Sequence, residues 1–288
     1  LRERGLECPA FRMAVHSTIP LGAGLSSSAA LEVSTGAALR SLFDLSVSDF
    51  DLAHVCQKAE NTFTGAQCGL LDQFSSLFGR QDHFLFLDFR TLEHRAVRLP
   101  DPDLCLALAL SGVTHSLAES AYNDRRAECT RAGEFFASRS PNAKTLRDIT
   151  MAELRSAGGA LDPVARRRAA HIVGEDERVL KGVRLLEEGA LESFGKLLYE
   201  SHRSSVENFE NSCPELDALV GIAEGVHGVH GSRLTGGGFG GATLTPLPRG
   251  RLAAFEKAVK TGYHPPDSDT TVVYAAATAD GAGVVQGE

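Results

Sequence analysis

The sequence predicts a two-domain protein of the α+β class, and three observations lead to that prediction. The chain has 288 residues, a length that suits two domains of ordinary size. Its pattern changes after residues 100–103, where two prolines alternate with two aspartates, so we place a boundary there between domains of residues 1–103 and 104–288. Beyond residue 104 the strand and helix patterns follow an order consistent with a βαββαβ-like domain.

The first predicted domain combines a strand, helices and a hairpin. Apolar and polar residues alternate over residues 11–15, which predicts a half-buried strand that ends at Pro20. Apolar residues then recur at helical spacing, and the expected helical stretches are 26–43, 47–63 and, as a short helix or tight turn, 68–78. Two further apolar runs, 84–89 and 93–99, predict the paired strands of a hairpin.

The second predicted domain begins with an apolar run at 104–110, which indicates a buried strand. A long helix is expected at 116–136, and residues 150–207 have a nearly continuous helical pattern. The remaining expected elements are a helix at 215–226, a strand at 241–246, a helix at 251–261 and a strand at 271–277.

The composition is ordinary for a soluble globular protein and argues against several other classes. Hydrophobic residues make up 43% and charged residues 23% of the chain. No run of about eighteen apolar residues is present, so no transmembrane helix is predicted. A net charge of −8 argues against nucleic acid or a membrane surface as partner, since either would favour a basic face. Six cysteines without a C-x-x-C pair favour free thiols in the cytoplasm over disulfides or a zinc site.

The most informative local pattern is Pro20-Leu-Gly-Ala-Gly-Leu-Ser-Ser-Ser-Ala-Ala30, which leads directly into the first predicted helix. Glycine lets the backbone approach an anion closely, and a helix N-terminus presents unpaired N–H groups with a partial charge of about half a unit. The loop is not a Walker A motif, because no Lys-Ser/Thr pair follows, nor a dinucleotide fingerprint, because Ser27 occupies the last glycine position. Phosphate binding is one interpretation of this loop, and a serine-capped glycine turn is the other.

A second glycine-rich stretch, Ser232-Arg-Leu-Thr-Gly-Gly-Gly-Phe-Gly-Gly241, matches the spacing G-x-G-x-x-G. A strand-like run follows it, whereas a dinucleotide site needs a helix at this place. Five glycines within six positions instead predict a backbone that passes very close to another group, either the phosphate loop or its ligand.

Five motifs, taken in their order and spacing, make the chain resemble the GHMP kinases, and within them the galactokinases. The loop at residues 20–30 is similar to the second motif of the family, and Leu234–Gly241 is similar to the third. The other matching stretches are Cys68-Gly-Leu-Leu-Asp-Gln-Phe74, His115-Ser-Leu-Ala118 with Tyr122-Asn-Asp-Arg-Arg126, and Glu200-Ser-His-Arg203 with Ser212-Cys-Pro-Glu-Leu-Asp217. The resemblance extends from about residue 10 to about residue 280.

The resemblance implies the two-domain GHMP kinase fold, with a ribosomal S5 domain 2-like N-terminal part and a ferredoxin-like C-terminal domain that carries extra helices. It also implies a reaction in which the γ-phosphate of ATP is transferred to the anomeric hydroxyl of galactose, with Mg²⁺ as cofactor. The products would be galactose 1-phosphate and ADP. The expected protein is a cytoplasmic monomer that binds ATP and galactose, and binds neither nucleic acid nor a membrane.

The resemblance also assigns roles to single residues. Asp72 is the expected catalytic residue, which takes the proton from the anomeric hydroxyl or orients that hydroxyl. Ser27 and Glu60 are expected to bind the magnesium ion, and Asp72, Gly69 and Tyr122 to bind the sugar. The residues expected to bind the phosphates of ATP are Gly22, Gly24, Leu25, Ser26, Ser27, Ser28, Ala29, Gly236, Gly237 and Gly238.

The residues themselves give an independent reason to select Asp72. A carboxylate inside the apolar run 69–78 is costly unless it is paired or functional. The alternative interpretation of Asp72 is a helix-capping aspartate, and that of Glu60 is an ordinary surface carboxylate.

The first motif of the family, a segment of the type Arg-Val-Asn-Leu-Ile-Gly-Glu-His-Thr-Asp-Tyr, has no match in this chain. In the family that segment supplies a catalytic arginine, much of the sugar contact and part of the adenine pocket. The resemblance therefore implies an incomplete enzyme, in which the pKa of Asp72 is expected to rise because its cationic partner is missing.

Three alternatives to a galactose kinase stay open at this point. A kinase for a related sugar such as N-acetylgalactosamine would share these motifs. A non-catalytic, galactokinase-like sugar sensor would have a shortened Ser-Ala part of the phosphate loop. Residues 26–30 are intact and Asp72 is present, so an enzyme is favoured over a sensor. The third alternative is a remnant without activity, because the first motif is missing.

Overall fold

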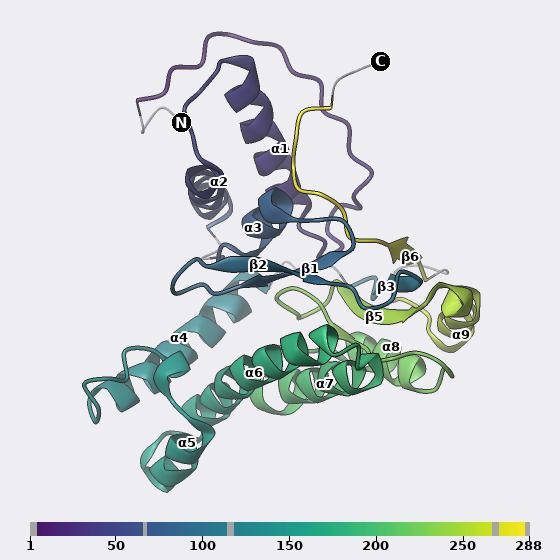
Figure 1. The fold of residues 1–288 in the computed structure, drawn as a ribbon. Coiled ribbons are helices and arrows are strands. Elements are labelled where there is room, and N and C mark those ends of the chain that lie inside the picture. Colours follow the sequence, from purple (N-terminus) through teal and green to yellow (C-terminus); the bar gives the residue numbers. More distant parts are fainter. Residues whose placement is uncertain (1–4, 66–67, 114–117, 267–270, 286–288) are drawn as a thin grey trace. The chain divides into compact units, whose positions relative to one another are not determined.

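The computed structural model describes residues 5–65, 68–113, 118–266 and 271–285, and its ribbon is drawn in Figure 1. The chain forms two compact units, one made of Leu1–Arg98 with Ala277–Glu288 and the other of Leu99–Ala276. The C-terminal residues 277–288 thus belong to the same compact unit as the N-terminal part of the chain. The domain limits expected from the sequence, 1–103 and 104–288, stay predictions.

Helices and a hairpin make up the described part of the first unit. They are α1 (Ser27–Leu42), α2 (Asp49–Thr64), α3 (Leu71–Phe78), β1 (His83–Leu87) and β2 (His94–Arg98). The two strands pair antiparallel, with Leu85 opposite Ala96. The predicted helices and hairpin are confirmed, and every predicted end lies within three residues of the observed one.

The contact between α1 and α2 is close because α1 places a glycine there. A Cβ at Gly36 would lie 2.6 Å from Leu52 Cδ1, so a larger residue would displace the Leu52 side chain. Leu52 is buried together with Val33 of α1 and Phe74 of α3. Phe74 packs edge-on against Phe50, with ring centroids 5.5 Å apart. This core holds α1, α2 and α3 together. Ser28, Glu60 and Asp72, which belong to the candidate site, each lie on one of these three helices.

The strand predicted at residues 11–15 is wrong, because this stretch contains neither strand nor helix. Its apolar side chains Phe11, Met13 and Val15 are all exposed. A strand needs a neighbour that supplies a ladder of backbone hydrogen bonds. Among the described residues of the first unit, β1 and β2 pair only with each other. Alternation of apolar and polar residues therefore predicted a strand for which the structure offers no partner.

The end of the chain packs on the first unit next to α3. The N–H of Gly281 donates to the carbonyl of Gly79 at 2.9 Å. The carboxylate of Asp280 accepts from the N–H of Gln81, also at 2.9 Å, across 199 positions of sequence. A Cβ at Gly281 would lie 2.0 Å from the carbonyl oxygen of Leu77, so this approach depends on glycine.

A four-stranded antiparallel sheet organises the second unit. Its strands are β3 (Leu104–Leu110), β4 (Arg233–Leu234), β5 (Ala242–Pro248) and β6 (Val273–Ala276), in the spatial order β4-β5-β3-β6. Helices connect β3 to β4 and β5 to β6, so the chain order is βαββαβ and the sheet is that of a split βαβ fold. The predicted ferredoxin-like C-terminal domain is confirmed.

The helices of the second unit are α4 (Ala118–Ala137), α5 (Met151–Ala157), α6 (Pro163–Glu187), α7 (Leu191–Ser204), α8 (Pro214–Glu224) and α9 (Leu252–Gly262). Leu219 of α8 and Phe255 of α9 are fully buried against Ala107 of β3, so these two helices cover the sheet. Helices α6 and α7 run side by side (Figure 1). The predicted helices and strands are confirmed, except that residues 116–117 lie outside the described part of the chain.

Helix α7 continues directly into a single π-helical turn, η4 (Ser205–Phe209), and Glu210 follows with φ 54°. Arg168 of α6 lies beneath this turn and is 1% exposed. Its guanidinium donates to Glu128, to Glu210 and to the carbonyl of Asn208, each at 2.6 Å. A buried guanidinium needs such partners, because an unpaired buried charge is strongly destabilising. The Arg168 group therefore fixes the backbone of the turn.

All six cysteines carry free thiols, as their spacing predicted. Burial raises the pKa of the Cys56 thiol to about 11, so this thiol stays protonated at neutral pH. Across the described residues, no helix combines the length and the apolar character needed to cross a membrane.

Candidate functional site

Candidate functional side chains gather at one place in each unit, and the first group begins at the serine-rich loop. Gly22 and Gly24 have φ of 71° and 69°, a left-handed conformation that glycine adopts without strain. Ser26 follows with φ 53°, and its side chain does not cap α1. The N–H groups of residues 27–29 consequently have no hydrogen-bond partner within the described residues. An uncapped helix N-terminus of this kind is suited to bind an anion.

The side chain of Ser26 instead forms a hydrogen bond with Asp72, in the first turn of α3. Burial raises the pKa of Asp72, the hydrogen bond from Ser26 lowers it, and the negative charge of Glu60 raises it, with a net rise above its ordinary value. A carboxylate with a raised pKa accepts a proton more readily, and that is the property a general base needs.

Glu60 of α2 lies at the centre of a hydrogen-bonded group. Ser28 Oγ donates to Glu60 Oε1 at 2.5 Å, and Gln73 Nε2 donates to Glu60 Oε2 at 2.9 Å. Gln73 Nε2 also lies 3.4 Å from Glu32 Oε2. Burial, followed by the charge of Glu60, raises the pKa of Glu32 to about 7. The carboxyl groups of Glu32, Glu60 and Asp72 thus share one region and repel each other when ionised.

This region fits a hard divalent cation. Ser28 Oγ and Glu60 Oε1 are adjacent oxygen atoms, and a bound cation would offset the repulsion among the carboxylates. Gln73 Oε1 is buried and has no hydrogen-bond partner, so a further oxygen is unsatisfied there. The described residues include no group of three or more His, Cys, Asp or Glu that would cage a metal by itself. Mg²⁺ usually takes only one or two carboxylates and completes its shell with water and substrate phosphates.

The loop that leads to Asp72 is held by two side chains of α2. Asn61 Oδ1 accepts hydrogen bonds from the N–H of Cys68 at 3.1 Å and from its thiol at 2.8 Å. Gln57, one helical turn earlier, donates from Nε2 to the carbonyl of Cys68 at 3.0 Å. Helix α3 starts at Leu71, and the N-cap residue Leu70 provides no side-chain cap. The two amide side chains of α2 therefore position the start of the helix that carries Asp72.

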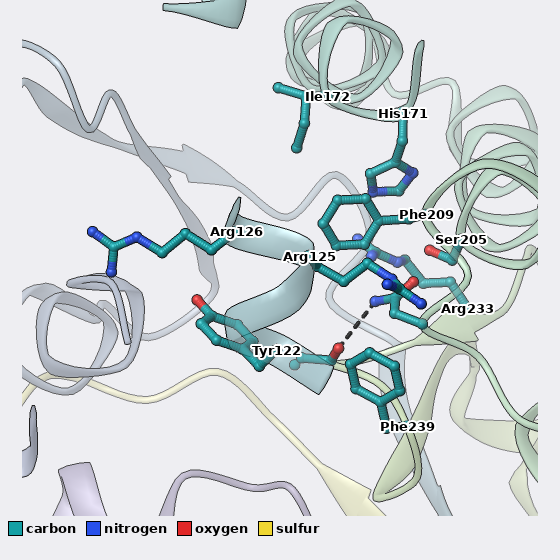
Figure 2. Close-up of a pocket in the computed structure, with 12 residues that line it drawn as sticks. Tyr122, Arg125, Arg126, His171, Ile172, Ser205, Phe209, Arg233 and Phe239 are labelled. Atoms are coloured by element: carbon teal, nitrogen blue, oxygen red, sulfur yellow. Dashed lines mark hydrogen bonds between the residues drawn. The ribbon is translucent and has the colours of Figure 1, made fainter. Parts of the chain in front are cut away.

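The second group of functional side chains lines a pocket of about 240 Å³ in the second unit (Figure 2). Its lining residues come from α4, α6, the π-helical turn and the loop that follows it, β4 and the glycine loop. They are Tyr122, Arg125, Arg126, His171, Ile172, Ser205, Phe209, Asn211, Arg233, Gly236, Gly237 and Phe239.

The pocket combines a neutral imidazole with guanidinium groups. The His171 ring stacks on Phe209 with ring centroids 4.5 Å apart, and its Nδ1 lies 3.0 Å from Ser204 Oγ. Burial lowers the pKa of His171 to about 4, so the ring is uncharged at neutral pH. Arg233 lies 3.8 Å from the carboxylate of Glu175 through Nη1. Aromatic, polar and cationic groups together suit a ligand that carries hydroxyl or phosphate groups.

The glycine loop, residues 235–241, borders the same pocket. Gly236 and Gly238 have φ of 70° and 81°. The N–H groups of residues 236–238 have no hydrogen-bond partner within the described part of the chain. Successive backbone N–H groups of this kind form a concave binding site for an anion. The loop does pass close to another group, because a Cβ at Gly238 would lie 2.0 Å from the carbonyl oxygen of Asn211. The approach to the phosphate loop or its ligand that the glycines predicted stays a prediction.

The structure brings together several of the residues that the sequence selected. In the first unit Ser26 meets Asp72, and it is Ser28, not Ser27, whose hydroxyl contacts Glu60. Gly69 is exposed just before α3. In the second unit Tyr122, Gly236 and Gly237 line one pocket. Ala29 is fully buried, so only its backbone is available to a ligand, and Leu25 is half-buried. His115 of the family-like stretch lies outside the described residues.

Sequence reasoning did not select Glu32, Gln57, Asn61, Gln73 and Asn211. A helical signal was available for some of them, because Glu32 follows Ser28 by four positions and residues 57, 60 and 61 share one face of α2. Gln73 stands next to Asp72 in sequence. No local pattern connects Asn211 to the glycine loop 26 positions later.

Two family descriptions match the chain. The GHMP kinases N terminal domain matches residues 1–80, and the GHMP kinases C terminal domain matches residues 183–264. The first range includes the serine-rich loop and the carboxyl groups of Glu32, Glu60 and Asp72, and the second range includes the glycine loop. The fold, the two groups of functional residues and these matches define the class as that of the GHMP kinases.

Similar proteins narrow this class. A galactokinase from Roseiflexus sp. (strain RS-1) is 40% identical over 285 residues, which are 99% of this chain and 73% of the relative. A galactokinase from Homo sapiens is 42% identical over 277 residues, which are 96% of this chain and 68% of the relative. The crystal structure of Lactococcus lactis galactokinase complexed with galactose matches with a TM-score of 0.85 at 33% identity, covering 91% of this chain and 68% of that one. The chain therefore belongs to the galactokinase group of the GHMP kinase family.

Proposed function

We propose that the protein carrying this sequence transfers the γ-phosphate of ATP to the anomeric hydroxyl of galactose, forming galactose 1-phosphate and ADP. The observation that carries this proposal is the identity of 40% and 42% to two galactokinases over nearly the whole chain. The match to a galactokinase crystallised with galactose supports the same substrate. The uncapped N-terminus of α1 and the half-buried carboxyl group of Asp72 provide chemistry that such a reaction requires.

Asp72 is assigned the role of accepting the proton of the anomeric hydroxyl, or of orienting that hydroxyl. Phosphoryl transfer asks little covalent chemistry of the protein, so positioning and charge stabilisation dominate. Ser26 holds the Asp72 carboxylate through a hydrogen bond. Gln57 and Asn61 of α2 bind the backbone of Cys68 and so position α3, the helix that carries Asp72. Its raised pKa, which burial causes, supports the role of a base.

Mg²⁺ is assigned to Ser28 and Glu60. The sequence selected Ser27 with Glu60, but the 2.5 Å contact between Ser28 Oγ and Glu60 Oε1 supports Ser28 as the hydroxyl ligand. Bound Mg²⁺ would neutralise charge on the ATP phosphates. The hydrogen bond from Gln73 holds the Glu60 carboxylate in its orientation.

The phosphates of ATP are assigned to backbone amides in both units. In the first unit these are the N–H groups of residues 27–29, with Gly22 and Gly24 allowing close approach. In the second unit they are the N–H groups of residues 236–238. The sugar is assigned to Asp72, Gly69 and Tyr122, the last of which lines the second-unit pocket.

We also propose that the protein is cytoplasmic and acts as a monomer. Free thiols at all six cysteines suit a reducing compartment. Analytical ultracentrifugation of the purified protein would measure the oligomeric state directly.

The proposed function is tested by measuring ADP and galactose 1-phosphate formed from ATP, Mg²⁺ and galactose by the natural polypeptide that carries this sequence. Glucose and N-acetylgalactosamine serve as alternative acceptors, and excess EDTA removes the divalent cation. Turnover with galactose that EDTA abolishes is the expected result. Turnover with N-acetylgalactosamine alone would reassign the substrate, and galactose binding without ADP formation would replace the kinase by a sugar sensor.

A further inference from the structure

We infer that Asn211 is a positioning residue of the glycine loop and that it sets the affinity of this loop for the phosphates of ATP. The inference rests on the proposed function, which assigns phosphate binding to the amides of the loop. Asn211 lies just outside the stretches through which the chain resembles its family. Its contacts, all within the second unit, point to this role.

Asn211 holds the glycine loop through its side chain and its backbone. Nδ2 donates to the carbonyl of Gly237 at 3.0 Å, and the carbonyl of Asn211 accepts from the N–H of Phe239 at 2.6 Å. Gly238, between these two residues, lies so close that a Cβ there would be 2.0 Å from the Asn211 carbonyl oxygen. Asn211 is 6% exposed, so water competes little for these hydrogen bonds. One residue thus contacts three consecutive residues of the loop.

These hydrogen bonds decide which atoms of the loop can face a ligand. A peptide unit is planar, and its C=O and N–H point in opposite directions. Because Asn211 binds the C=O of Gly237, the N–H of Gly238 in the same peptide unit points away from Asn211. The N–H groups of residues 236–238 have no partner in the described part of the chain. If the Gly237 peptide rotated, a carbonyl oxygen would replace an amide donor and would repel a phosphate.

Asn211 is itself held in place by the π-helical turn. Its N–H donates to the carbonyl of Ser205 at 3.2 Å. The preceding residue, Glu210, binds the buried guanidinium of Arg168 at 2.6 Å, and this hydrogen bond lowers the pKa of Glu210. The base from which Asn211 reaches the loop is therefore rigid. Rigid support of this kind pre-organises a binding site and removes part of the entropy cost of binding.

The position of these contacts relates them to a ligand and not only to folding. Asn211, Gly236, Gly237 and Phe239 all line the pocket of about 240 Å³. Phe239 is labelled in Figure 2. The Arg125 guanidinium lies 5.9 Å from the Phe239 ring centre on the same pocket. A change at Asn211 therefore alters the wall of a space that a ligand can enter.

The test compares Asn211→Asp with Asn211→Ala in the natural polypeptide. Aspartate keeps the shape of the side chain but replaces the donor Nδ2 by an oxygen that faces the Gly237 carbonyl. We expect the KM for ATP and the dissociation constant of ATP to rise about tenfold in Asn211→Ala and at least as much in Asn211→Asp. The KM for galactose is expected to stay within about twofold of its original value, because the loop is assigned to phosphate.

Asn208→Ala is the matched control, on the π-helical turn that precedes Asn211. The Asn208 side chain donates to Ser204 Oγ at 3.2 Å and not to the glycine loop, so its removal is expected to leave the ATP affinity unchanged. ATP binding is also measured without turnover, by calorimetry, and thermal unfolding checks that each variant is folded at the assay temperature. If Asn211→Ala does not fold, Asn211→Asp and Asn211→Ser provide the comparison.

The outcomes separate this inference from the proposed function. Wild-type ATP affinity in Asn211→Asp would show that only the volume of the side chain matters, and would overturn the inference. A wild-type protein that binds ATP but does not phosphorylate galactose would overturn the proposed function, while a tenfold loss of ATP affinity in the variants would still support the role of Asn211. A wild-type protein that binds no ATP would overturn both.

Discussion

At the scale of single residues, the neighbours of Asp72 shift its pKa in opposite directions. Burial and the charge of Glu60 raise its pKa, while the hydrogen bond from Ser26 lowers it. Ser26 reaches Asp72 because it adopts φ 53° and does not cap its own helix. One serine conformation thus leaves the N-terminus of α1 uncapped and also binds the proposed base.

Asp72→Asn is expected to reduce kcat by about 10²- to 10⁴-fold, because an amide cannot accept the proton of the sugar hydroxyl. The dissociation constant of ATP is expected to change less than about threefold. Steady-state kinetics and nucleotide calorimetry measure the two quantities. Asp82→Asn, at an exposed aspartate of the same unit, is the control and is expected to keep the original kcat. An Asp72→Asn protein with the original kcat would remove Asp72 from the mechanism.

His171 connects pH to stability. Burial lowers its pKa to about 4 in the folded state, against 6.5 for an unperturbed histidine. The unfolded chain therefore binds the proton more readily, and the folded state loses stability as pH falls from about 6.5 to about 4. Because one pKa unit corresponds to about 1.4 kcal/mol, this loss approaches ~3 kcal/mol at the lower end of the range.

The contribution of His171 is measured by comparing the original protein with His171→Gln in thermal unfolding between pH 7 and pH 4.5. Glutamine does not titrate, so its unfolding temperature is expected to fall less steeply with acidification. Glu175, Arg178 and Arg233, which surround the imidazole, are the same residues in both proteins. The His171 charge helps to lower the pKa of Glu175, so the comparison reports His171 together with its effect on that carboxylate. Parallel curves for the two proteins would exclude His171 as the source of the pH dependence.

At the scale of elements, α2 acts as the support of the first-unit site. Residues 57, 60 and 61 project from one face of this helix. Glu60 binds Ser28 and Gln73, while Gln57 and Asn61 bind both backbone groups of Cys68. Residues on both sides of Asp72 in sequence are therefore held by the same helix, so a shift of α2 would move the proposed base.

Asn61→Ala tests this support. Without the Asn61 oxygen, the N–H and thiol of Cys68 lose their acceptor, and the start of α3 becomes less well positioned. We expect kcat to fall about five- to tenfold while the KM for ATP stays within about twofold. Thr62→Ala, one residue further on α2, is the control, because the Thr62 hydroxyl donates only to the carbonyl of Lys58 in its own helix. Equal kcat in the Asn61 variant and the control would contradict the supporting role of Asn61.

The elements show what periodicity alone can predict. The α1, α2 and α3 helices followed from apolar spacing, because hydrogen bonds within a helix are local and its buried face recurs at fixed intervals. The short strand β4 (Arg233–Leu234) was not predicted, because two residues are too few to show a period. The stretch 11–15 had strand-like alternation but formed no strand. Strand formation depends on a partner elsewhere in the chain, and alternation carries no information about that partner.

At the scale of the whole molecule, the chain returns to its first unit after the last strand of the second. Gly281 meets Gly79 and Leu77, although about 200 residues separate them. The sequence-based boundary assigned residues 277–288 to the second domain. No local pattern marks this return, because the contacts are made by backbone groups and small residues.

Gly281→Ala is expected to destabilise the first unit by about 1–3 kcal/mol, because its Cβ would lie 2.0 Å from the carbonyl oxygen of Leu77. Denaturant unfolding measures the loss, and hydrogen exchange is expected to increase at the C-terminal end of α3. Gly283→Ala is the control, since its Cβ would approach no atom of the described residues closer than 4.0 Å. Equal stability of the two variants would show that the terminal segment does not stabilise the unit.

The sequence by itself determined the helices, the strands other than β4, the two glycine-containing loops and the selection of Asp72. Each of these depends on local spacing or on a residue type that is costly at its position, whereas Glu60 was selected through the family resemblance. Only the tertiary structure decided that Ser28 rather than Ser27 meets Glu60, that Gln57 and Asn61 hold Cys68, and that Asn211 holds the glycine loop. The reason is that a one-residue change in helix phase, or a turn that joins distant segments, changes which side chains meet, and no local pattern specifies either.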